Sequence, residues 1–365
     1  MYRETWHNLD LSLLAATIAV VVFGVAAGYS ATTNTSGLEE LTYRQVIYAI
    51  IGLIIMIVLA FVDYRFLENL QKPLYMAVIV VLAILLVIGQ IRFGAQRWLD
   101  ISLFPIQPSE LTKILVIVIL AKYVADHFEL MSSFRYVIFS LLFVLPPILL
   151  IYFQPALGTS LCIAAVWLGM IVAAGARFLH LSIMGLVAVG SLPILWMVMR
   201  DYMRQRIYTF INPVSDPLGA GYNVIQARIA IGSGGLWGTG FTQGTQSQLH
   251  FLRVRHTDFI FSVIGEELGF AGAILLFALF AFIIWRILRA ASYSRDNFGY
   301  LIAYGVATII FFQSLVNVGM NLGLMPITGI PLPFVSSGGS SLITFLIGLG
   351  LVQSIIVHHK RLGFQ

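Results

Sequence analysis

The segment Arg253–Phe261 gathers the residue types needed for acid–base chemistry within nine positions. It reads RVRHTDFIF, so that Asp258 follows several basic residues and precedes a long apolar run. A helix N-terminus stabilises a carboxylate at its first turn, and a carboxylate among cations could act as a base on a polyanionic substrate. The alternative is an ordinary helix start, in which Thr257 or Asp258 caps the helix and Arg255 or His256 is its salt partner.

A second polar group lies in the stretches GAQRWLD and QPSELTK, residues 94–113. Pro108 suits the first position of a helix, and Glu110 and Lys113 then lie three residues apart on one helix face. They could form a local ion pair that lets both charges enter the membrane edge. Alternatively, Lys113 and Arg97 could hold phosphate groups. Trp98 could stack on a sugar, although an interfacial anchor is the commoner use of tryptophan.

Two glycine-rich stretches could approach a ligand through their backbone. Residues 232–240 read GSGGLWGTG and are soon followed by GTQSQ, but the spacing is not that of a dinucleotide-binding motif, and a tight folded loop is the alternative. Residues 331–341 read PLPFVSSGGSS. Their amides and the hydroxyls of Ser336, Ser337 and Ser340 could bind an anion; the alternative is a plain hairpin loop.

The elements that must position these residues are membrane spans. Of the 365 residues, 59% are hydrophobic and 10% are charged, whereas a soluble domain carries roughly 25% charged residues. This excludes a soluble globular protein and a disordered chain, and the continuous apolar runs exclude a β-barrel. The single cysteine, Cys162, excludes an intrachain disulfide and a cysteine metal site. The net charge of +5, without a basic soluble domain, favours anionic lipid or substrate over nucleic acid.

Apolar runs predict an all-α polytopic membrane protein of about ten transmembrane helices, in a single domain over residues 1–365. The eighth run is long and is expected to tilt or protrude. The predicted spans are Leu11–Tyr29, Gln45–Phe61, Leu74–Ile91, Leu111–Val124, Tyr136–Tyr152, Gly158–Ala174, Leu179–Met199, Phe259–Leu288, Tyr300–Leu322 and Ser340–Val357.

The distribution of Lys and Arg predicts that both termini are cytoplasmic. With the N-terminus inside, the basic residues of the outer side gather almost entirely in Arg92–Lys113 and in the large extracytoplasmic loop of about residues 200–257, between the seventh and eighth helices. An anionic ligand at the outer face would explain both clusters. The alternative is pairing with the outer carboxylates Asp100, Glu110, Asp201 and Asp216.

Two further features lie in and beyond that loop. Tyr222–Ile231 is predicted to form a short amphipathic helix, with Tyr222, Ile225 and Ile229 on one face. Glu266 and Glu267 lie inside the eighth run, where carboxylates are candidate functional residues. They lie too far along the helix from the 258 position to share its chemistry, so we expect a structural role with bonds to Asn317 or Asn321.

These motifs resemble the SEDS family of bacterial cell-wall proteins (shape, elongation, division and sporulation) over essentially the whole chain. The resemblance rests on NPVSDPLGAGYNVIQ at 212–226, residues 231–240, GTQSQ at 244–248, RHTDFIFSVIGEEL at 255–268, and residues 317–341. The wording of 255–261 and 328–333 favours the elongation branch, RodA, over the division and sporulation branches. The chain departs from the family pattern at Ala156, usually Asp, and at Ser337, usually Tyr.

The resemblance implies a peptidoglycan glycosyltransferase that polymerises lipid II, an undecaprenyl-pyrophosphoryl disaccharide-pentapeptide, into β-1,4 strands. It would act at the outer face of the cytoplasmic membrane during cell elongation and shape maintenance, with Asp258 at the position of the family's catalytic aspartate. A lipid II flippase and a non-catalytic scaffold for a transpeptidase are the alternatives. The candidates for holding substrate are Arg97, Trp98, Glu110, Lys113, Arg204, Gln226, Arg253, Arg255, His256, Ser336, Ser337 and Ser340.

The resemblance also implies partners and a metal. A class B penicillin-binding protein, which is a single-span transpeptidase, is the expected partner, together with other membrane proteins of the elongation complex. Mg²⁺ or Mn²⁺ is expected at the pyrophosphate, although the sequence contains no dedicated metal site.

Overall fold

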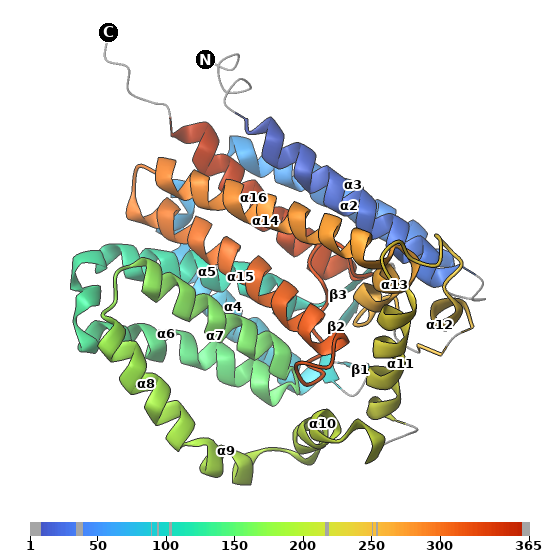
Figure 1. Ribbon diagram of the computed structural model, residues 1–365. Helices are drawn as coiled ribbons and strands as arrows, with labels where there is room; N and C mark the ends of the chain where they lie inside the picture. Colours follow the sequence, from blue (N-terminus) through green and yellow to red (C-terminus); the bar gives the residue numbers. More distant parts are fainter. Residues whose placement is uncertain are drawn as a thin grey trace.

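The chain folds into a bundle of long apolar helices (Figure 1). The computed structural model describes residues 9–33, 39–88, 90–92, 95–101, 104–215, 219–249, 251–252 and 255–359. The long helices are α2 (Leu11–Thr32), α3 (Glu39–Phe61), α4 (Gln71–Ile88), α5 (Pro108–Asp126), α6 (Phe134–Phe153), α7 (Leu157–Ala173), α14 (Gly269–Tyr293), α15 (Asn297–Asn321) and α16 (Gly339–His358). The shorter α-helices are α8 (Phe178–Gly190), α9 (Leu192–Val198), α10 (Asp201–Ile211), α11 (Ala220–Ser233), α12 (Thr245–Gln248) and α13 (Ile260–Glu267). Short 3₁₀ helices cover Tyr64–Leu70 (η1), Phe128–Ser132 (η2) and Pro213–Ser215 (η3).

Within the described residues, seven helical segments are long and apolar enough to cross a membrane, and the bent pair α8–α9 would make an eighth. The protein is therefore an integral membrane protein with an essentially helical fold. All ten predicted runs are helical over most of their length, but α7, with 17 residues, is shorter than the other spans, and α5 carries four charged residues. Length and composition thus give seven or eight spans, not the predicted ten.

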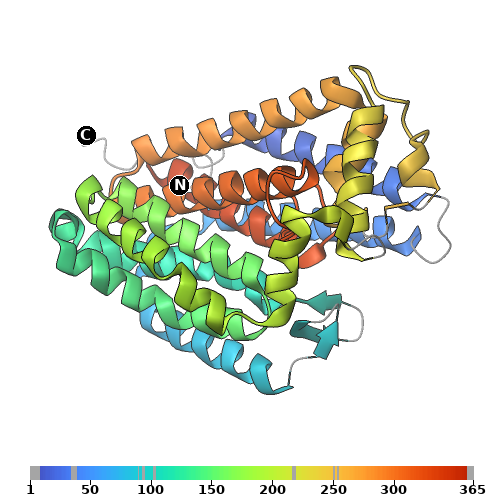
Figure 2. The ribbon, with the colours of Figure 1, turned by 60° about the horizontal axis from the view of Figure 1, so that its bottom comes forward.

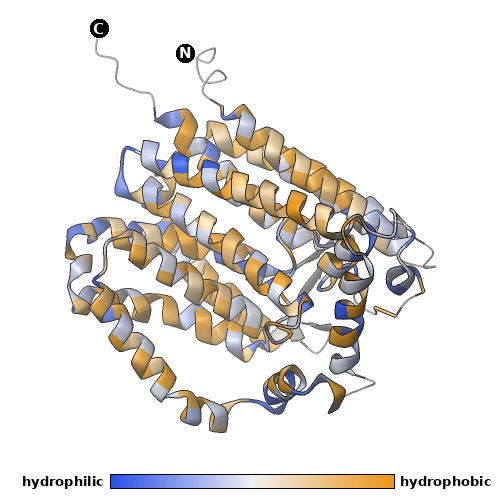
Figure 3. Ribbon diagram, viewed as in Figure 1, coloured by the Kyte–Doolittle hydropathy of each residue, from blue (hydrophilic) through white to orange (hydrophobic). Residues whose placement is uncertain are grey.

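The helices α15 and α16 lie at the centre and are largely buried. The helix α16 packs against α3, α5, α14 and α15. Small residues allow the closest approach: a Cβ on Gly350 would lie 3.0 Å from the carbonyl oxygen of Met56 on α3. Close packing through small residues is how helices associate where lipid removes the hydrophobic driving force. Figure 3 shows apolar residues along the helices, with hydrophilic residues gathered near helix ends and on α10–α12.

Polar contacts join the first and last helices at one end of the bundle. Gln353 near the end of α16 and Asp10, which caps α2, exchange two hydrogen bonds of 2.9 and 3.0 Å. Arg286 of α14 forms an ion pair with the Asp10 carboxylate. Nearby, Asp296 accepts from the Tyr64 hydroxyl (2.6 Å), and Tyr64 N donates to Ser354 Oγ of α16. The start of α2 and the end of α16 therefore lie on the same side of the bundle.

A three-stranded antiparallel sheet lies near the opposite end (Figure 2). It consists of β1 (Gln90–Arg92), β2 (Ala95–Ile101) and β3 (Phe104–Ile106), in the order β1-β2-β3. The third span was predicted to end at Ile91, whereas α4 ends at Ile88 and Gln90–Arg92 form a strand. The strands are too short for their alternation to be recognised, because two of them have only three residues.

The predicted eighth span is broken, and the glycine-rich segment closes the break. Between α13 and α14 the chain turns at Gly269, whose φ of +64° favours glycine. Phe270 N and Ala271 N, at the start of α14, donate to the carbonyls of residues 235 and 236 over 3.0 Å each. In the other direction, the amides of residues 239 and 240 donate to the last two carbonyls of α13. The segment 232–240 is thus a tight folded loop whose backbone satisfies both helix ends.

Two helical details differ from the sequence expectation. The segment 222–231 is helical, within α11, but its buried face consists of Val224, Ala227 and Ala230, and Ile229 is exposed. Ala227 and Ala230 of this face form a small buried cluster with Leu252 and Phe259, and α11 also contacts α13. The seventh span bends by 47° between α8 and α9. All residues of α8 and α9 are exposed or half-exposed, and the pair leaves the bundle in both ribbon views (Figures 1 and 2).

Candidate active site

Asp258 lies in a turn just before α13, and α15 holds its backbone. The Asp258 carbonyl accepts from Asn317 Nδ2 (3.1 Å) and Asn321 Nδ2 (2.9 Å). Asn321 Oδ1 accepts from the backbone and hydroxyl of Ser262 on α13. The N-cap of α13 is Phe259, with no side-chain cap bond. The structure thus assigns the N-cap position to Phe259 rather than to Thr257 or Asp258, and α15 holds the turn.

The Asp258 carboxylate and the Arg206 guanidinium both lie close to Gly329. A Cβ on Gly329 would lie 3.8 Å from Asp258 Oδ2 and 3.9 Å from each terminal nitrogen of Arg206. Gly329 has a φ of +70°, in the region that favours glycine. Arg206 Nη1 also donates to Ile327 O (3.0 Å), and its guanidinium lies 5.8 Å from the centre of the Tyr202 ring. A carboxylate and a cation thus border the same glycine, from the turn before α13 and from α10.

Arg206 was not among the predicted site residues. The sequence placed it only in the outer basic cluster and favoured Arg204 as a substrate ligand. In the structure, Arg204 donates to the carbonyls of Trp196 (3.1 Å) and Met197 (2.9 Å) and so binds the end of α9. Its interaction with Asp201, at 3.5 Å, is one of the acidic pairings considered for the outer arginines.

The residues before Asp258 are buried and tied to neighbouring segments. Arg255 is 3% exposed and donates to the carbonyl of Ala31 at the end of α2. Burial lowers the pKa of Arg255 below its usual range, against the opposing charge of Glu267. Burial, and then the charge of Arg255, lowers the pKa of His256 below its usual 6.5. Within the described part of the chain, His256 Nδ1 is buried without a hydrogen-bond partner.

The serine-rich loop packs against the same turn. Ser336 Oγ donates to Thr257 O (2.6 Å) and accepts from Leu332 N (2.8 Å). Ser337 N donates to His256 O (2.9 Å), and its hydroxyl donates to Gln45 Oε1 of α3. Ser340 Oγ accepts from the backbone of residue 107. The loop is therefore not a plain hairpin: it is built into the site, and these hydroxyls hold it there.

Glu110 and Lys113 form a buried ion pair on α5, which begins at Pro108 as predicted. Lys113 Nζ lies 2.8 Å from Glu110 Oε2, and the lysine side chain is 1% exposed. Lys113 also donates to Gln313 Oε1 of α15 (3.0 Å), and Gln313 Nε2 donates to Pro331 O (2.9 Å). A chain of polar contacts thus runs from the ion pair to the loop that contains Gly329. The ion-pair alternative is present in the structure, while phosphate binding by Lys113 stays a prediction.

Glu266 and Glu267 hold the segment that follows the glycine-rich loop. Glu266 accepts from the amides of Gln246 (2.7 Å) and Ser247 (3.0 Å). Glu267 accepts from Ser30 Oγ of α2 (2.7 Å) and from the amide of residue 242. The expected bonds to Asn317 or Asn321 are wrong, because those amides bind the turn at Asp258. The structural role itself agrees with these contacts.

For the remaining predicted site residues, the structure gives the element on which each described residue lies. Gln226 lies on α11 and is half-buried. Arg97 and Trp98 lie on β2, where Trp98 pairs with Gln90 of β1. Arg253 lies outside the described residues. Among the described residues, no group of three His, Cys, Asp or Glu side chains could hold a metal ion, and the requirement for Mg²⁺ or Mn²⁺ stays a prediction.

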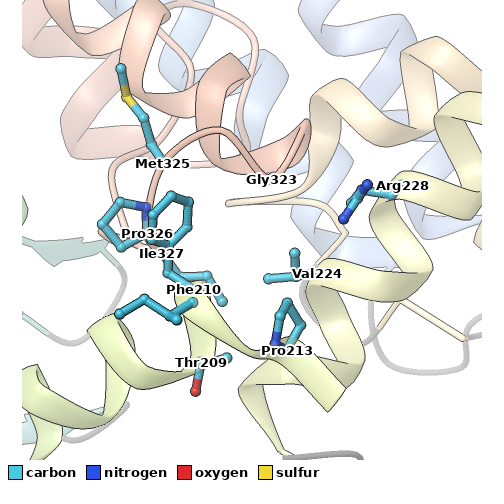
Figure 4. A pocket seen from close by; sticks show the side chains of 10 residues that line it. Thr209, Phe210, Pro213, Val224, Arg228, Gly323, Met325, Pro326 and Ile327 are labelled. Atoms are coloured by element: carbon cyan, nitrogen blue, oxygen red, sulfur yellow. The ribbon is translucent and has the colours of Figure 1, made fainter. Parts of the chain in front are cut away.

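A cavity of about 150 Å³ is lined by Ile327, the residue whose carbonyl accepts from Arg206. It lies between the end of α10, the helix α11 and the loop after α15 (Figure 4). Its walls are mostly apolar and include Phe210, Val224 and Ile327, with Arg228 as the charged residue.

Comparison with known proteins identifies the family of the chain. Residues 7–361 match the model of the FtsW/RodA/SpoVE family, which is described as a cell cycle protein family. This chain belongs to the FtsW/RodA/SpoVE family. The match confirms the resemblance to the SEDS proteins, since FtsW, RodA and SpoVE are its division, elongation and sporulation members.

Relatives in this family are similar along nearly their whole length. The peptidoglycan glycosyltransferase MrdB of Escherichia coli K12 is 40% identical over 357 residues, which cover 98% of this chain and 95% of that protein. The stage V sporulation protein E of Bacillus subtilis is 35% identical over 354 residues, covering 95% and 96%. A probable FtsW glycosyltransferase of Geobacter metallireducens is 38% identical over 365 residues, covering 97% and 96%.

Solved structures of family members have the same fold. One chain comes from a structure described as the structural coordination of polymerization and crosslinking by a peptidoglycan synthase complex. It is 32% identical, with a TM-score of 0.82, over 97% of this chain and 99% of that one. The crystal structure of the rod shape determining protein RodA of Thermus thermophilus is 30% identical, with a TM-score of 0.70, over 95% and 96%.

Proposed function

We propose that this protein is a peptidoglycan glycosyltransferase that polymerises lipid II into β-1,4 glycan strands during cell elongation and shape maintenance. Family membership and the names of the E. coli and Geobacter relatives support the activity. The observation that carries the proposal is that the Asp258 carboxylate and the Arg206 guanidinium both lie close to Gly329. A base and a cation at one point are what transfer of a sugar from a diphosphate requires.

The reaction needs one displacement. Asp258 takes the proton of the 4-hydroxyl of the acceptor's GlcNAc while that oxygen attacks the anomeric carbon of the donor. A new carbon–oxygen bond forms as the bond to the pyrophosphate breaks, so that the α-linked donor gives a β-linked product, as in other inverting sugar chemistry. Arg206 stabilises the negative charge that develops on the departing undecaprenyl pyrophosphate. The two asparagines on α15 hold the backbone that carries this carboxylate.

Other candidates divide into two roles. Lys113, Glu110, Arg204 and the three serines have partners that fix the surrounding segments, and we assign them to positioning the site. Arg255, which is buried and donates to Ala31 O, joins them. The candidates for direct contact with substrate are Arg97, Trp98, Gln226, Arg253 and His256. A divalent ion, Mg²⁺ or Mn²⁺, would take its ligands from the phosphates of the substrate and from a single carboxylate of the protein. Mg²⁺ is commonly bound in this way.

We further propose ten spans with both termini in the cytoplasm. The helices α5 and α7 would be the two additional spans, since both pack against the central α15. Arg65, Lys122 and Arg286 lie with the start of α2 and the end of α16, as expected for a cytoplasmic end. The Asp258 turn then faces outward, where residues 200–257 form the large extracytoplasmic loop.

The proposed partners are a class B penicillin-binding protein and other membrane proteins of the elongation complex. A similar chain has been solved within a peptidoglycan synthase complex that couples polymerization with crosslinking. A transpeptidase bound at the outer face would receive each glycan strand close to the site where it is made.

The direct test is to reconstitute the protein with its transpeptidase partner, supply labelled lipid II and separate the products on a gel. Glycan polymer is the expected product. A separate liposome assay measures whether lipid II crosses the membrane. Transfer of lipid II across the membrane without polymer would make the protein a flippase. Binding of the transpeptidase without either activity would make it a scaffold.

A further inference from the structure

The cavity at the end of α10 combines apolar walls with one cation. Phe210, Val224 and Ile327 line it together with the guanidinium-bearing Arg228 (Figure 4). Its volume is about 150 Å³, and apolar cavities of about this size bind benzene. The cavity therefore suits a branched five-carbon group of the size of one isoprene unit. An anionic group attached to it would meet the arginine.

Arg228 is available for such an anion. Among the residues that the structure describes, its guanidinium has no hydrogen-bond or ion-pair partner. Gly323, with a φ of +72°, faces the arginine stem: a Cβ there would lie 3.0 Å from Arg228 Cδ. The glycine thus leaves the space that the arginine side chain occupies at the rim of the cavity. An unpaired cation at the rim of an apolar cavity favours a ligand with a negative head and an apolar stem.

The cavity shares a wall with the reacting groups. The side chain of Ile327 lines the cavity, and its carbonyl accepts from Arg206. Two residues further on, a Cβ on Gly329 would lie within 4 Å of both Asp258 Oδ2 and the terminal nitrogens of Arg206. A ligand with its stem in the cavity would therefore have Arg228 at the rim and Arg206 behind the wall that Ile327 forms.

The cavity also borders an apolar surface. Phe210 and Ile211 line it while being 37% and 73% exposed, and Val214 on the following turn is 72% exposed. They lie at the end of α10, a short helix with both charged and apolar residues, which suits the plane of the membrane interface. An apolar chain could continue from the cavity over these side chains into the lipid.

We propose that this cavity holds the first isoprene unit of a polyprenyl diphosphate, with its diphosphate between Arg206 and Arg228. Because this rests on the proposed function, the ligand is the polyprenyl diphosphate of the glycan donor, which is the leaving group of the transfer. The apolar wall recognises the prenyl group, and the two arginines recognise the diphosphate. The arrangement places the bond that breaks within reach of Asp258 and its acceptor.

The test measures binding to the purified full-length protein in detergent, without turnover. Farnesyl diphosphate is the probe, and farnesol and inorganic pyrophosphate each carry one half of its chemistry. We expect farnesyl diphosphate to bind more tightly than either half. Arg228→Gln should weaken it by about ten- to a hundredfold, the usual worth of a charged hydrogen bond. Arg228→Lys should recover part of the loss.

A second variant tests the apolar wall. Val224→Phe fills the cavity and should weaken farnesyl diphosphate while leaving inorganic pyrophosphate unchanged. Arg200→Gln, at an exposed arginine just before α10, is the matched charge control and should bind as the unmodified protein does. A thermal melt confirms that each variant is folded. If Val224→Phe does not fold, Arg228→Gln, at the rim of the cavity, remains as the test.

The outcomes separate this proposal from the proposed function. Unchanged binding of farnesyl diphosphate by folded Arg228→Gln overturns the proposal, even if the protein polymerises lipid II. Loss of binding in Arg228→Gln and Val224→Phe, in a protein that makes no glycan, supports the polyprenyl diphosphate site and contradicts the glycosyltransferase instead.

Discussion

The side-chain amide of Asn321 donates to the main-chain carbonyl of Asp258 over 2.9 Å, across 63 positions of sequence. The same side chain accepts two hydrogen bonds from Ser262, on the other side of the turn. One residue at the end of the central helix α15 therefore fixes both sides of the segment that carries the proposed base. Asn317 adds a bond to the same carbonyl and one to Ile330, so that the turn and the loop after α15 move together.

Removing this clamp should slow the chemistry more than it weakens binding. Asn321→Ala leaves buried partners unsatisfied, which costs about 1–3 kcal/mol of stability. The carboxylate would then shift relative to Arg206, and the polymerisation rate should fall by about ten- to a hundredfold while the Kd for lipid II changes little. Ser314→Ala, on the same helix, is the control, because Ser314 Oγ lacks a hydrogen-bond partner within the described residues. Equal rates for both variants would contradict the clamp.

Replacing one residue of the buried ion pair on α5 should destabilise the fold, whereas replacing both together should be tolerated. Either Glu110→Gln or Lys113→Met leaves one charged or polar partner unmatched, and breaking a buried pair costs about 3–5 kcal/mol. Joint replacement by leucine and methionine should restore much of the melting temperature and retain polymerisation. A folded double variant with a much weaker affinity for lipid II would show that Lys113 holds phosphate instead.

Glu266 should protect the segment around α12 from opening. Its carboxylate accepts two backbone amides, and glutamine would replace one acceptor oxygen with a donor. In Glu266→Gln, amide hydrogen exchange at residues 246 and 247 should speed up, and the melting temperature should fall. Glu40→Gln on α3, at an exposed ion pair with Arg44, is the matched control, since such pairs contribute little. Unchanged exchange in Glu266→Gln would refute this role.

Stability should fall as the pH drops below about 6.5, the ordinary pKa of histidine. The pKa of His256 is lowered in the folded protein, so that the unfolded chain takes up a proton at a higher pH than the folded one does. Stability then rises with pH between the lowered pKa and 6.5 and is lost as the pH falls through this range. His256→Gln should flatten this part of a plot of melting temperature against pH. A slope as steep as that of the unmodified protein would assign the effect to another group.

The sequence was informative where the signal is local. Pro108 starts α5, and the i, i+3 spacing of Glu110 and Lys113 gives the observed pair. Features that depend on contacts between distant segments could not be predicted. The partners of Glu266 and Glu267 lie on α2 and on the segment 242–248, which no periodicity connects with α13. The break at Gly269 is stable only because a distant glycine-rich loop satisfies its backbone, so the apolar run looked continuous.

Arg206 illustrates the same limit at the site. Within RDYMRQR, two arginines two residues apart on a helix point in different directions. The sequence alone gave no reason to prefer one over the other. Only the loop after α15, with the left-handed Gly329 and the carbonyl of Ile327, distinguishes Arg206 from Arg204.

The central claim is that Asp258 is the base, and one comparison tests it most directly. Unmodified protein and Asp258→Asn would be reconstituted with the transpeptidase partner and labelled lipid II, with binding of the partner and of lipid II measured for both. Asparagine keeps the shape and the backbone contacts but cannot accept the proton, so polymer should appear only with the unmodified protein, a loss of at least about a hundredfold. Polymer from both proteins would remove Asp258 as the base and point to Glu110 or the Glu266–Glu267 pair.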